Sequence, residues 1–322
     1  MEQDEGQNEW LELLQRLNQQ WPLSPDMPIA EERRVRRRIA DTLAAATADP
    51  VDDGARIHEF AVEAGGWGGF VRIYEPWRIG DNAPTQLFLH GGGFVHGSTR
   101  ELVNDSLLAA RAVATGIRIV SFEYPLAPEH PFPAARDATV ALLAELVERA
   151  PQLGIDVGRL GLGGNSAGAS VAASAALRLA AEDRQTIHHL LLEVPAVSLA
   201  KLDAFFREHP EYAQEYAAIL AHYRPALDGS AFVADAAELR GFPSTLLMLA
   251  EADPVTEGGL LLADRLRAVD VPVRAHVVPG TSHATPGITR ISTQAMQWRA
   301  IVDGELRTAY RTQEPEEETN AR

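Results

Sequence analysis

The sequence predicts an α/β protein with a mostly parallel central sheet flanked by helices. Short, nearly continuous apolar runs, the pattern of strands buried on both faces, recur along the chain. Amphipathic or alanine-rich helical segments separate most of these runs, and strands that alternate with helices pair in parallel. The expected strands are 86–89, 117–122, 160–162, 190–194, 245–249 and 273–278, and the expected helices are 101–115, 134–150, 167–182, 258–268 and 286–309.

A hairpin precedes these alternating elements. Residues 57–62 and 70–74 are rich in β-branched and aromatic side chains, and the glycine-rich stretch 65–69 lies between them. Because glycine adopts the backbone conformations that tight turns need, this stretch favours a turn between two paired strands.

Two helical regions lie outside the alternation. In residues 1–50, apolar side chains recur at helical spacing over 10–17 and again over about 31–46, with three prolines between the two stretches. The second region, 196–240, is a long helical insert, and we interpret its aromatic side chains as core or lid packing rather than as a dedicated binding site. These aromatic residues are Phe205, Phe206, Tyr212, Tyr216 and Tyr223.

The charge balance disfavours two classes of partner. The chain carries 29 Lys and Arg against 45 Asp and Glu, a formal net charge of −16. Nucleic acid and anionic lipid are themselves negative, so neither is an expected partner. The arginine-rich stretch 33–38 is interpreted as a solvated helix face that neighbouring carboxylates neutralise. Those carboxylates are Glu31, Glu32 and Asp41.

The chain contains no cysteine, which excludes a disulfide framework, a thiolate nucleophile and a cysteine-ligated metal. No apolar run reaches the 18 or so residues of a membrane-spanning helix. The acidic start, Met1–Glu5, has no apolar segment of the kind that signal peptides carry. A cytoplasmic protein without a membrane span is therefore expected.

The strongest functional signal is the pentapeptide Gly164–Gly168, which has the pattern G-x-S-x-G. It follows the apolar run that ends near Leu162 and precedes an alanine-rich helix, the strand–turn–helix context of a nucleophile elbow. Ser166 would lie at the helix N-terminus, where unpaired N–H groups favour negative charge. The alternative is a glycine–serine loop that only caps the helix, and the context favours the nucleophile.

A second motif, His90–Phe94, contains three consecutive glycines directly after the expected strand 86–89. Glycines allow backbone N–H groups to point into a cleft, as an oxyanion hole requires, although they could also simply end the strand. Nucleotide-binding loops are not matched, because the glycine pattern that starts at Gly161 is incomplete and the single lysine, Lys201, follows no glycine. The two motifs together are more specific than either alone.

A nucleophilic serine needs a base and a carboxylate that orients the base. Asp253 lies just past the expected strand 245–249, and His283 lies just past the expected strand 273–278. Both follow Ser166 in the order serine, acid, histidine, which is an order that known serine hydrolases use. Two other carboxylates compete with Asp253 for the orienting role, Glu251 and Glu257.

With these motifs placed, the chain resembles the hormone-sensitive-lipase-like branch of the α/β-hydrolases, the bacterial family IV esterases. The resemblance covers roughly residues 55–305. It implies the α/β-hydrolase fold with a helical cap, built from the N-terminal helices and from the insert near 196–240. The motifs that carry it are His90–Gly93, the run Tyr124–Ala135 (YPLAPEHPFPAA), Gly164–Gly168 and Asp253–Pro254.

The resemblance also implies site residues. Ser166, Asp253 and His283 would form the catalytic triad, and the N–H groups of Gly91, Gly92 and Ala167 would form the oxyanion hole. The chain departs from the family pattern before the serine, where Asn165 replaces an aspartate, and also at Pro125 and Ala284–Thr285. The candidate substrate-binding residues are Phe94, Asn165, Phe205 and Tyr216.

The expected activity is hydrolysis of short-to-medium acyl esters through an acyl-enzyme, with a small-molecule acyl ester as substrate and no metal or organic cofactor. One alternative is a specialised natural-product hydrolase acting on an amide, a lactone or an acetyl group, or an acyl transferase or cyclase with the same triad. A second is a non-catalytic ligand-binding protein. Plant hormone receptors that resemble this family lose the catalytic histidine, so the presence of His283 argues against that second alternative.

The expected organisation is an N-terminal helical cap segment at 1–50 and a catalytic domain at 51–311 that includes the cap insert. A disordered acidic tail is expected at 312–322, because its composition is highly charged and poor in apolar residues. Members of the family often form dimers through the final strand and helix, so the resemblance implies a homodimer that uses 273–278 and 286–309.

Overall fold

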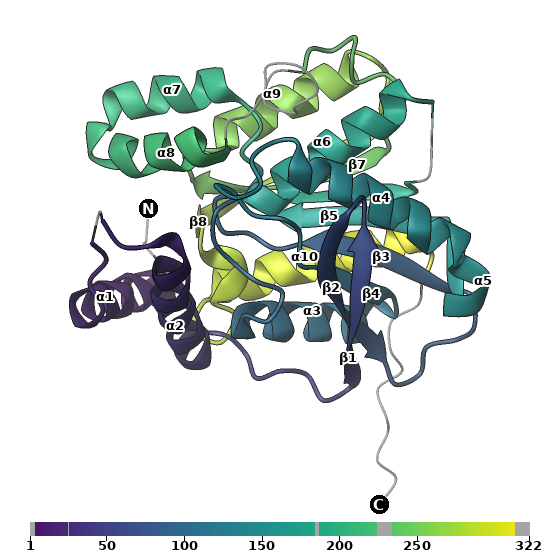
Figure 1. The fold of residues 1–322 in the computed structure, drawn as a ribbon, viewed down its shortest axis with the longest axis horizontal. Helices are drawn as coiled ribbons and strands as arrows, with labels where there is room; N and C mark the ends of the chain where they lie inside the picture. Colours follow the sequence, from purple (N-terminus) through teal and green to yellow (C-terminus); the bar gives the residue numbers. More distant parts are fainter. Residues whose placement is uncertain (1–3, 25, 184–186, 224–233, 313–322) are drawn as a thin grey trace, which may run out of the picture.

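A single sheet lies at the centre of the molecule (Figure 1). The structure, a computed structural model, describes residues 4–24, 26–183, 187–223 and 234–312. In these residues eight strands pair in the order β1-β2-β4-β3-β5-β6-β7-β8. They are β1 (Ala55–Ala64), β2 (Trp67–Pro76), β3 (Ala83–Leu89), β4 (Arg118–Phe122), β5 (Ile155–Asn165), β6 (His189–Glu193), β7 (Ser244–Ala252) and β8 (Val273–Ser282).

The strand directions confirm the predicted sheet. β1 and β2 form the expected antiparallel hairpin, β2 is also antiparallel to β4, and every later neighbouring pair is parallel. The turn of the hairpin is only Gly65 and Gly66, both with positive φ, so Trp67 already belongs to β2. A two-residue turn matches the twist of paired strands. The turn is therefore shorter than the glycine-rich stretch 65–69 that the sequence suggested.

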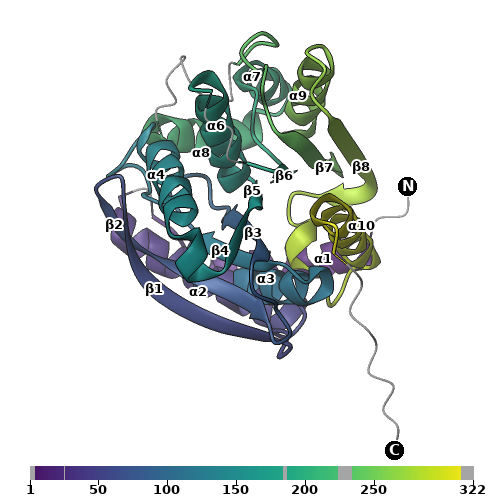
Figure 2. The same cartoon turned by 90° about the vertical axis from the view of Figure 1, so that its right-hand side faces the viewer.

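Helices cover both faces of the sheet, as an α/β protein requires (Figure 2). Two helices pack together on one face, and two others pack together on the opposite face, where a fifth covers β7 and β8. The first pair is α3 (Leu102–Thr115) and α10 (Thr293–Tyr310); the opposite helices are α4 (Ala134–Glu148), α6 (Ala167–Ala181) and α9 (Thr256–Arg267). The short helix α5 (Ala150–Leu153) leads into β5.

The central strands are buried from end to end. Every residue of β3, β4 and β6 is buried, which explains why these strands are visible in the sequence as continuous apolar runs. β5 is much longer than its predicted core of 160–162, because glycines and polar residues interrupt its apolar run. Its pairing with β3 nevertheless extends from Leu160 to Gly164, directly up to the serine turn.

Helix α10 begins later than the sequence indicated. A short 3₁₀ turn, Thr285–Gly287, occupies the start of the expected helix at 286. Proline favours the first turn of a helix but cannot donate a backbone hydrogen bond inside one, so the α-helix starts afterwards. Ser292 caps it by accepting a hydrogen bond of 3.0 Å from the N–H of Ala295.

Four of the described helices lie outside the layers that cover the sheet, and Figure 1 shows all four at the left of the molecule. They are α1 (Glu5–Gln20), α2 (Ile29–Thr47), α7 (Leu199–Glu208) and α8 (Pro210–Tyr223). The first two pack on each other through a small apolar cluster that is separate from the main core, consisting of Leu17, Ile39 and Leu43. Residues 224–233 of the insert and 313–322 of the expected tail lie outside the described residues.

Arginines on α2 have two different environments. Two of them pair with acidic residues on the same helix, as expected of a neutralised face: Arg36 with Glu32 and Arg37 with Asp41. Arg33 does not belong to such a face. It donates 2.7 Å hydrogen bonds to the backbone oxygens of Val95 and Ala127 and pairs with Glu129 at 2.7 Å, so it ties α2 to two loops of the core.

No helix in the described ranges combines the length and apolarity needed to cross a bilayer.

Candidate active site

Ser166 lies in the tight turn between β5 and α6. Its φ of 53° and ψ of −119° place a non-glycine residue in a strained region of backbone space. The turn packs so closely against β3 that a Cβ on Gly168 would stand 2.1 Å from the backbone oxygen of Leu89. Larger residues would collide with the neighbouring backbone, so the turn needs the small residues of the pentapeptide. The turn places Ser166 at the end of the sheet.

The strand next to β5 anchors this turn. The N–H of Ser166 donates a 2.8 Å hydrogen bond to the backbone oxygen of Glu193, the last residue of β6. The side chain of Glu193 is fully buried, where it pairs with Arg111 of α3 at 2.9 Å and accepts a 2.8 Å hydrogen bond from Trp298 of α10. Breaking a buried pair costs about 3–5 kcal/mol, so the contacts under the turn are costly to disrupt.

The parallel strands bring three predicted side chains together at one edge of the sheet. Ser166 follows β5, Asp253 follows β7 and His283 follows β8. Nε2 of His283 lies 2.8 Å from Oγ of Ser166, and Nδ1 of His283 lies 2.6 Å from Oδ2 of Asp253. These are hydrogen-bond distances, so the three side chains form one continuous chain from carboxylate to hydroxyl.

Asp253 controls the state of the imidazole. Its side chain is only 1% exposed, whereas the side chain of His283 is 46% exposed at the pocket wall. Burial on its own lowers the pKa of His283, but the charge of Asp253 and its hydrogen bond to the ring outweigh burial and raise the pKa. With Nδ1–H donating to Asp253, Nε2 is left to accept the proton of the Ser166 hydroxyl.

The two competing carboxylates have other partners. Oε2 of Glu251 accepts a 2.9 Å hydrogen bond from the N–H of Gly280, near the end of β8. The carboxylate of Glu257 pairs with Lys201 of α7 at 3.1 Å. The carboxylate that contacts His283 is that of Asp253.

The glycine loop, which we define as residues 90–97 after β3, borders the serine. A Cβ on Gly91 would stand 3.5 Å from the Cβ of Ser166, so the two backbones are close neighbours. Gly92 has a φ of 124°, and a Cβ there would lie 2.2 Å from the backbone oxygen of His96. Only glycine fits this turn.

Three backbone N–H groups near Ser166 remain available. Those of Gly91, Gly92 and Ala167 donate to no acceptor within the described part of the chain. Ala167 is the first residue of α6, where the helix leaves its N–H groups unpaired. Unpaired N–H groups beside a hydroxyl can stabilise an oxygen that becomes negative at that position.

Tyr124 supports the start of the glycine loop through its contacts with His90. The two rings stack at a centroid distance of 4.4 Å, and the hydroxyl of Tyr124 donates a 2.8 Å hydrogen bond to the backbone oxygen of His90. Burial lowers the pKa of His90, which keeps this ring neutral. Tyr124 starts the resemblance run, so part of that run supports the loop.

A pocket of about 360 Å³, which we call the Ser166 pocket, opens over the serine. Phe94 and Tyr216, two of the candidate substrate-binding residues, line it together with apolar residues from the insert and from the loop after β7. These further lining residues are Gly93, Ala196, Leu202, Phe206, Ile219, Pro254 and Val255. Apolar walls with a few convergent polar groups are typical of a small-molecule site.

Two of the predicted substrate-binding residues do not line this pocket. Phe205 instead stacks on His209, the residue that caps the end of α7, with ring centroids 4.3 Å apart, and its neighbour Phe206 faces the pocket. Consecutive helical residues point about 100° apart, so the two rings cannot share a direction. Asn165 is directed at the glycine loop, where its Oδ1 would lie 3.0 Å from a Cβ on Gly91.

Sequence reasoning missed Leu202, Phe206 and Ile219. Leu202 and Phe206 are separated by one helical turn on α7, and Tyr216 and Ile219 are three residues apart on α8. Residues three or four apart share a helix face, so the spacing from Tyr216 to Ile219 and from Leu202 to Phe206 was the signal that could have found them.

No group of three or more metal-ligating side chains that could hold an ion occurs within residues 4–24, 26–183, 187–223 and 234–312.

Comparison with known proteins agrees with this geometry. A family model described as the alpha/beta hydrolase fold matches residues 86–286. Esterase LipI of Mycobacterium tuberculosis is 30% identical and covers 82% of this chain and 84% of its own. Ethyl acetate hydrolase of Pseudomonas putida is 32% identical, over 66% of this chain and 70% of its own. The solved ester hydrolase EH1AB1, from a Lake Arreo metagenome, superimposes with a TM-score of 0.83 at 25% identity over 95% of this chain and 99% of its own.

The chain therefore belongs to the α/β-hydrolase fold family, in the hormone-sensitive-lipase-like branch that its motifs resemble. It is a serine hydrolase of carboxylic esters. The alternative of a non-catalytic ligand-binding protein is set aside by these relatives.

Proposed function

We propose that the enzyme hydrolyses short-to-medium acyl esters through an acyl-enzyme on Ser166. The observation that carries this proposal is the chain of hydrogen bonds from Asp253 through His283 to Ser166, which ends in the apolar Ser166 pocket. An acyl ester bound in this pocket lies against the serine hydroxyl.

In the first half-reaction, Oγ of Ser166 attacks the carbonyl carbon while Nε2 of His283 takes the hydroxyl proton. The carbonyl oxygen becomes negative and accepts hydrogen bonds from the N–H groups of Gly91, Gly92 and Ala167. The carbon–oxygen bond to the alcohol then breaks. His283 returns the proton to the leaving alcohol, and the acyl group stays on Ser166.

In the second half-reaction, water replaces the alcohol. His283 takes a proton from water as the water oxygen attacks the acyl carbon, and the same N–H groups hold the oxyanion. The bond to Ser166 breaks, His283 returns the proton to Oγ, and the carboxylic acid leaves. Throughout, Asp253 orients the imidazole and stabilises its protonated form.

The size and chemistry of the Ser166 pocket support the substrate class. About 360 Å³ is near the lower end of the range for small-molecule sites, and the wall residues Phe94, Leu202, Phe206 and Ile219 are apolar. Among the relatives, one from Pseudomonas putida is an ethyl acetate hydrolase and others from Salmonella are acetyl esterases. A pocket of this kind accepts a short hydrocarbon chain and has little room for a long one.

We assign the outer helices to a cap. Helices α7 and α8 supply Leu202, Phe206, Tyr216 and Ile219 to the wall, and α2 contacts the glycine loop through Arg33. The proposed organisation is a cap segment at 1–50 and a catalytic domain at 51–311 that contains the cap insert.

A series of p-nitrophenyl esters from acetate to palmitate tests the substrate class. We expect kcat/KM to be highest for short and medium chains and to fall steeply for the longest ones. Trapping with a p-nitrophenyl phosphonate ester should add one phosphonyl group to the peptide that contains Ser166. A maximum at palmitate would contradict the proposed chain length, and labelling at another serine would contradict the proposed nucleophile.

A further inference from the structure

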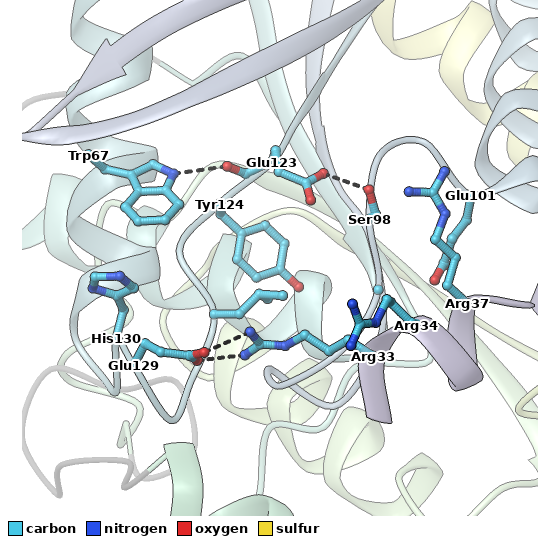
Figure 3. Close-up of a pocket in the computed structure, with 12 residues that line it drawn as sticks. Arg33, Arg34, Arg37, Trp67, Ser98, Glu101, Glu123, Tyr124, Glu129 and His130 are labelled. Atoms are coloured by element: carbon cyan, nitrogen blue, oxygen red, sulfur yellow. Dashed lines mark hydrogen bonds and ion pairs between the residues drawn. The ribbon is translucent and has the colours of Figure 1, made fainter. Parts of the chain in front are cut away.

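A second pocket, of about 430 Å³, adjoins the glycine loop on the α2 side (Figure 3). We call it the α2 pocket; it lies between Arg34 and Arg37 of α2 and Trp67 of β2, and Gly97 of the glycine loop lines it. In the described residues it shares no lining side chain with the Ser166 pocket. The two are therefore separate cavities.

Two guanidinium groups form one wall of the α2 pocket (Figure 3). Arg37 donates a 2.9 Å hydrogen bond to the backbone oxygen of Arg100 and stands 3.5 Å from Asp41. Arg34 has no carboxylate partner and donates no hydrogen bond among the residues that the structure describes. Arg34 thus gives this wall one positive charge that no carboxylate of the described residues pairs with.

None of the three carboxyl groups that line the pocket pairs with Arg34. Glu129 is engaged by Arg33 through two hydrogen bonds, of 2.9 and 2.7 Å. Glu123 accepts three hydrogen bonds from the hydroxyl and amide groups of residues 98–99. Burial, with the nearby charge of Asp41, raises the pKa of Glu101 to about 8, so this side chain is mostly uncharged at neutral pH.

The opposite wall is apolar and aromatic. The indole of Trp67 is fixed by a 3.0 Å hydrogen bond from Nε1 to the backbone oxygen of Glu123. His130 packs against it edge-on, with ring centroids 4.7 Å apart, and Leu126 also lines this part of the pocket. A fixed aromatic surface opposite guanidinium groups can hold a ligand that is apolar at one end and anionic at the other.

We propose that the α2 pocket binds a small organic carboxylate, with its carboxylate group at Arg34 and Arg37 and its aromatic or alkyl body against Trp67 and Leu126. Guanidinium groups bind carboxylates through parallel, charge-assisted hydrogen bonds, which gives the charged end its specificity. The acids that ester hydrolysis releases belong to this chemical class. The enzyme would thus carry, next to the glycine loop, a second site for the kind of molecule that it produces.

Calorimetric titration of the whole enzyme with phenylacetate, at low ionic strength, tests the proposal. Phenylacetamide is the matched neutral probe, because it keeps the ring and the size but lacks the charge. We expect phenylacetate to bind at least about tenfold more tightly than phenylacetamide, and added salt to weaken the binding. Equal binding of the two probes, or no binding of phenylacetate at millimolar concentration, would overturn the proposal.

Variants on α2 locate the site. Arg34→Gln should weaken phenylacetate binding about tenfold or more, since it removes a charge-assisted hydrogen bond. Arg38→Gln is the matched control, because Arg38 lies on the same helix but stacks on Trp21 at 4.3 Å. Trp67→Leu should weaken binding through the other wall. Thermal unfolding and turnover of p-nitrophenyl acetate should stay close to wild type in Arg34→Gln. Unchanged phenylacetate affinity in both Arg34→Gln and Trp67→Leu would place the ligand elsewhere and refute the site.

Discussion

The two pockets that adjoin the glycine loop differ in what their polar groups do. In the Ser166 pocket three polar side chains form a relay that runs from Asp253 to His283 to Ser166. The α2 pocket is the larger of the two, about 430 against 360 Å³, and has more charged groups, yet its described lining residues hold no such relay. The volume of a cavity therefore does not locate the chemistry; a strained nucleophile with an oriented base does.

The largest difference between the pockets should appear when one histidine is removed from each. His283→Ala deprives Ser166 of its base and should lower kcat for p-nitrophenyl acetate by about 10⁴- to 10⁶-fold. His130→Ala removes a ring that packs edge-on against Trp67 in the α2 pocket, away from the Asp253–His283–Ser166 chain, so kcat should change by a few-fold at most. Similar losses of kcat in the two variants would show that the catalytic groups are not confined to the Ser166 pocket.

The orienting carboxylate sets both rate and pH dependence. His283 must be neutral to accept a proton, so kcat/KM should fall as the pH drops through its pKa. Because Asp253 raises this pKa, the fall should occur above the ordinary histidine value of about 6.5. Asp253→Asn removes the raising charge and should shift the acidic limb to lower pH, with a loss of about 10⁴-fold in kcat. A limb that does not move would mean that Asp253 does not act on the imidazole.

The glycine loop should tolerate no side chain at Gly92. Gly92→Ala would force a Cβ to within 2.2 Å of the His96 oxygen and displace the N–H groups beside Ser166. Loss of oxyanion contacts costs about 10²- to 10³-fold in kcat. Gly68→Ala is the control, since a Cβ there meets nothing within 4 Å. Steady-state kinetics at saturating ester would distinguish the two, and a fully active Gly92→Ala enzyme would refute the role of this loop.

The smallest effect concerns two neighbouring rings on α7. Phe206→Ala enlarges the Ser166 pocket and should raise KM for p-nitrophenyl butyrate, with about 1–3 kcal/mol of binding lost, whereas Phe205→Ala should leave KM near wild type. A wild-type KM in Phe206→Ala would mean that this ring does not contact the acyl chain, and a raised KM in Phe205→Ala would mean that the other ring does.

The position of the candidate site could be predicted from the sequence because its signals depend on the backbone. A strand followed by a tight glycine turn specifies Ser166, and parallel strands end at one edge, so side chains that follow β5, β7 and β8 must meet. The same reasoning gives no direction for a side chain on an exposed helix. Spacing alone did not separate Phe205 from Phe206.

The arginines of α2 show the same limit more strongly. Their sequence suits a solvated face, and Arg36 and Arg37 do pair within the helix. Arg33, however, finds its partners at Val95 and Glu129, some 60 to 100 residues away in the chain, and no local pattern encodes such contacts. The α2 pocket arises from this long-range packing and was invisible before the fold was known.

The most direct test of the central claim is the comparison of Ser166→Ala with Ser174→Ala. Both serines lie in the same turn–helix unit, but Ser174 is about two helical turns further along α6, where its hydroxyl donates a 2.8 Å hydrogen bond to the backbone oxygen of Ser170. We predict that Ser166→Ala loses about 10⁶-fold in kcat for p-nitrophenyl acetate while remaining folded, and that Ser174→Ala stays within a few-fold of wild type. A folded Ser166→Ala enzyme with near-normal turnover would contradict the account.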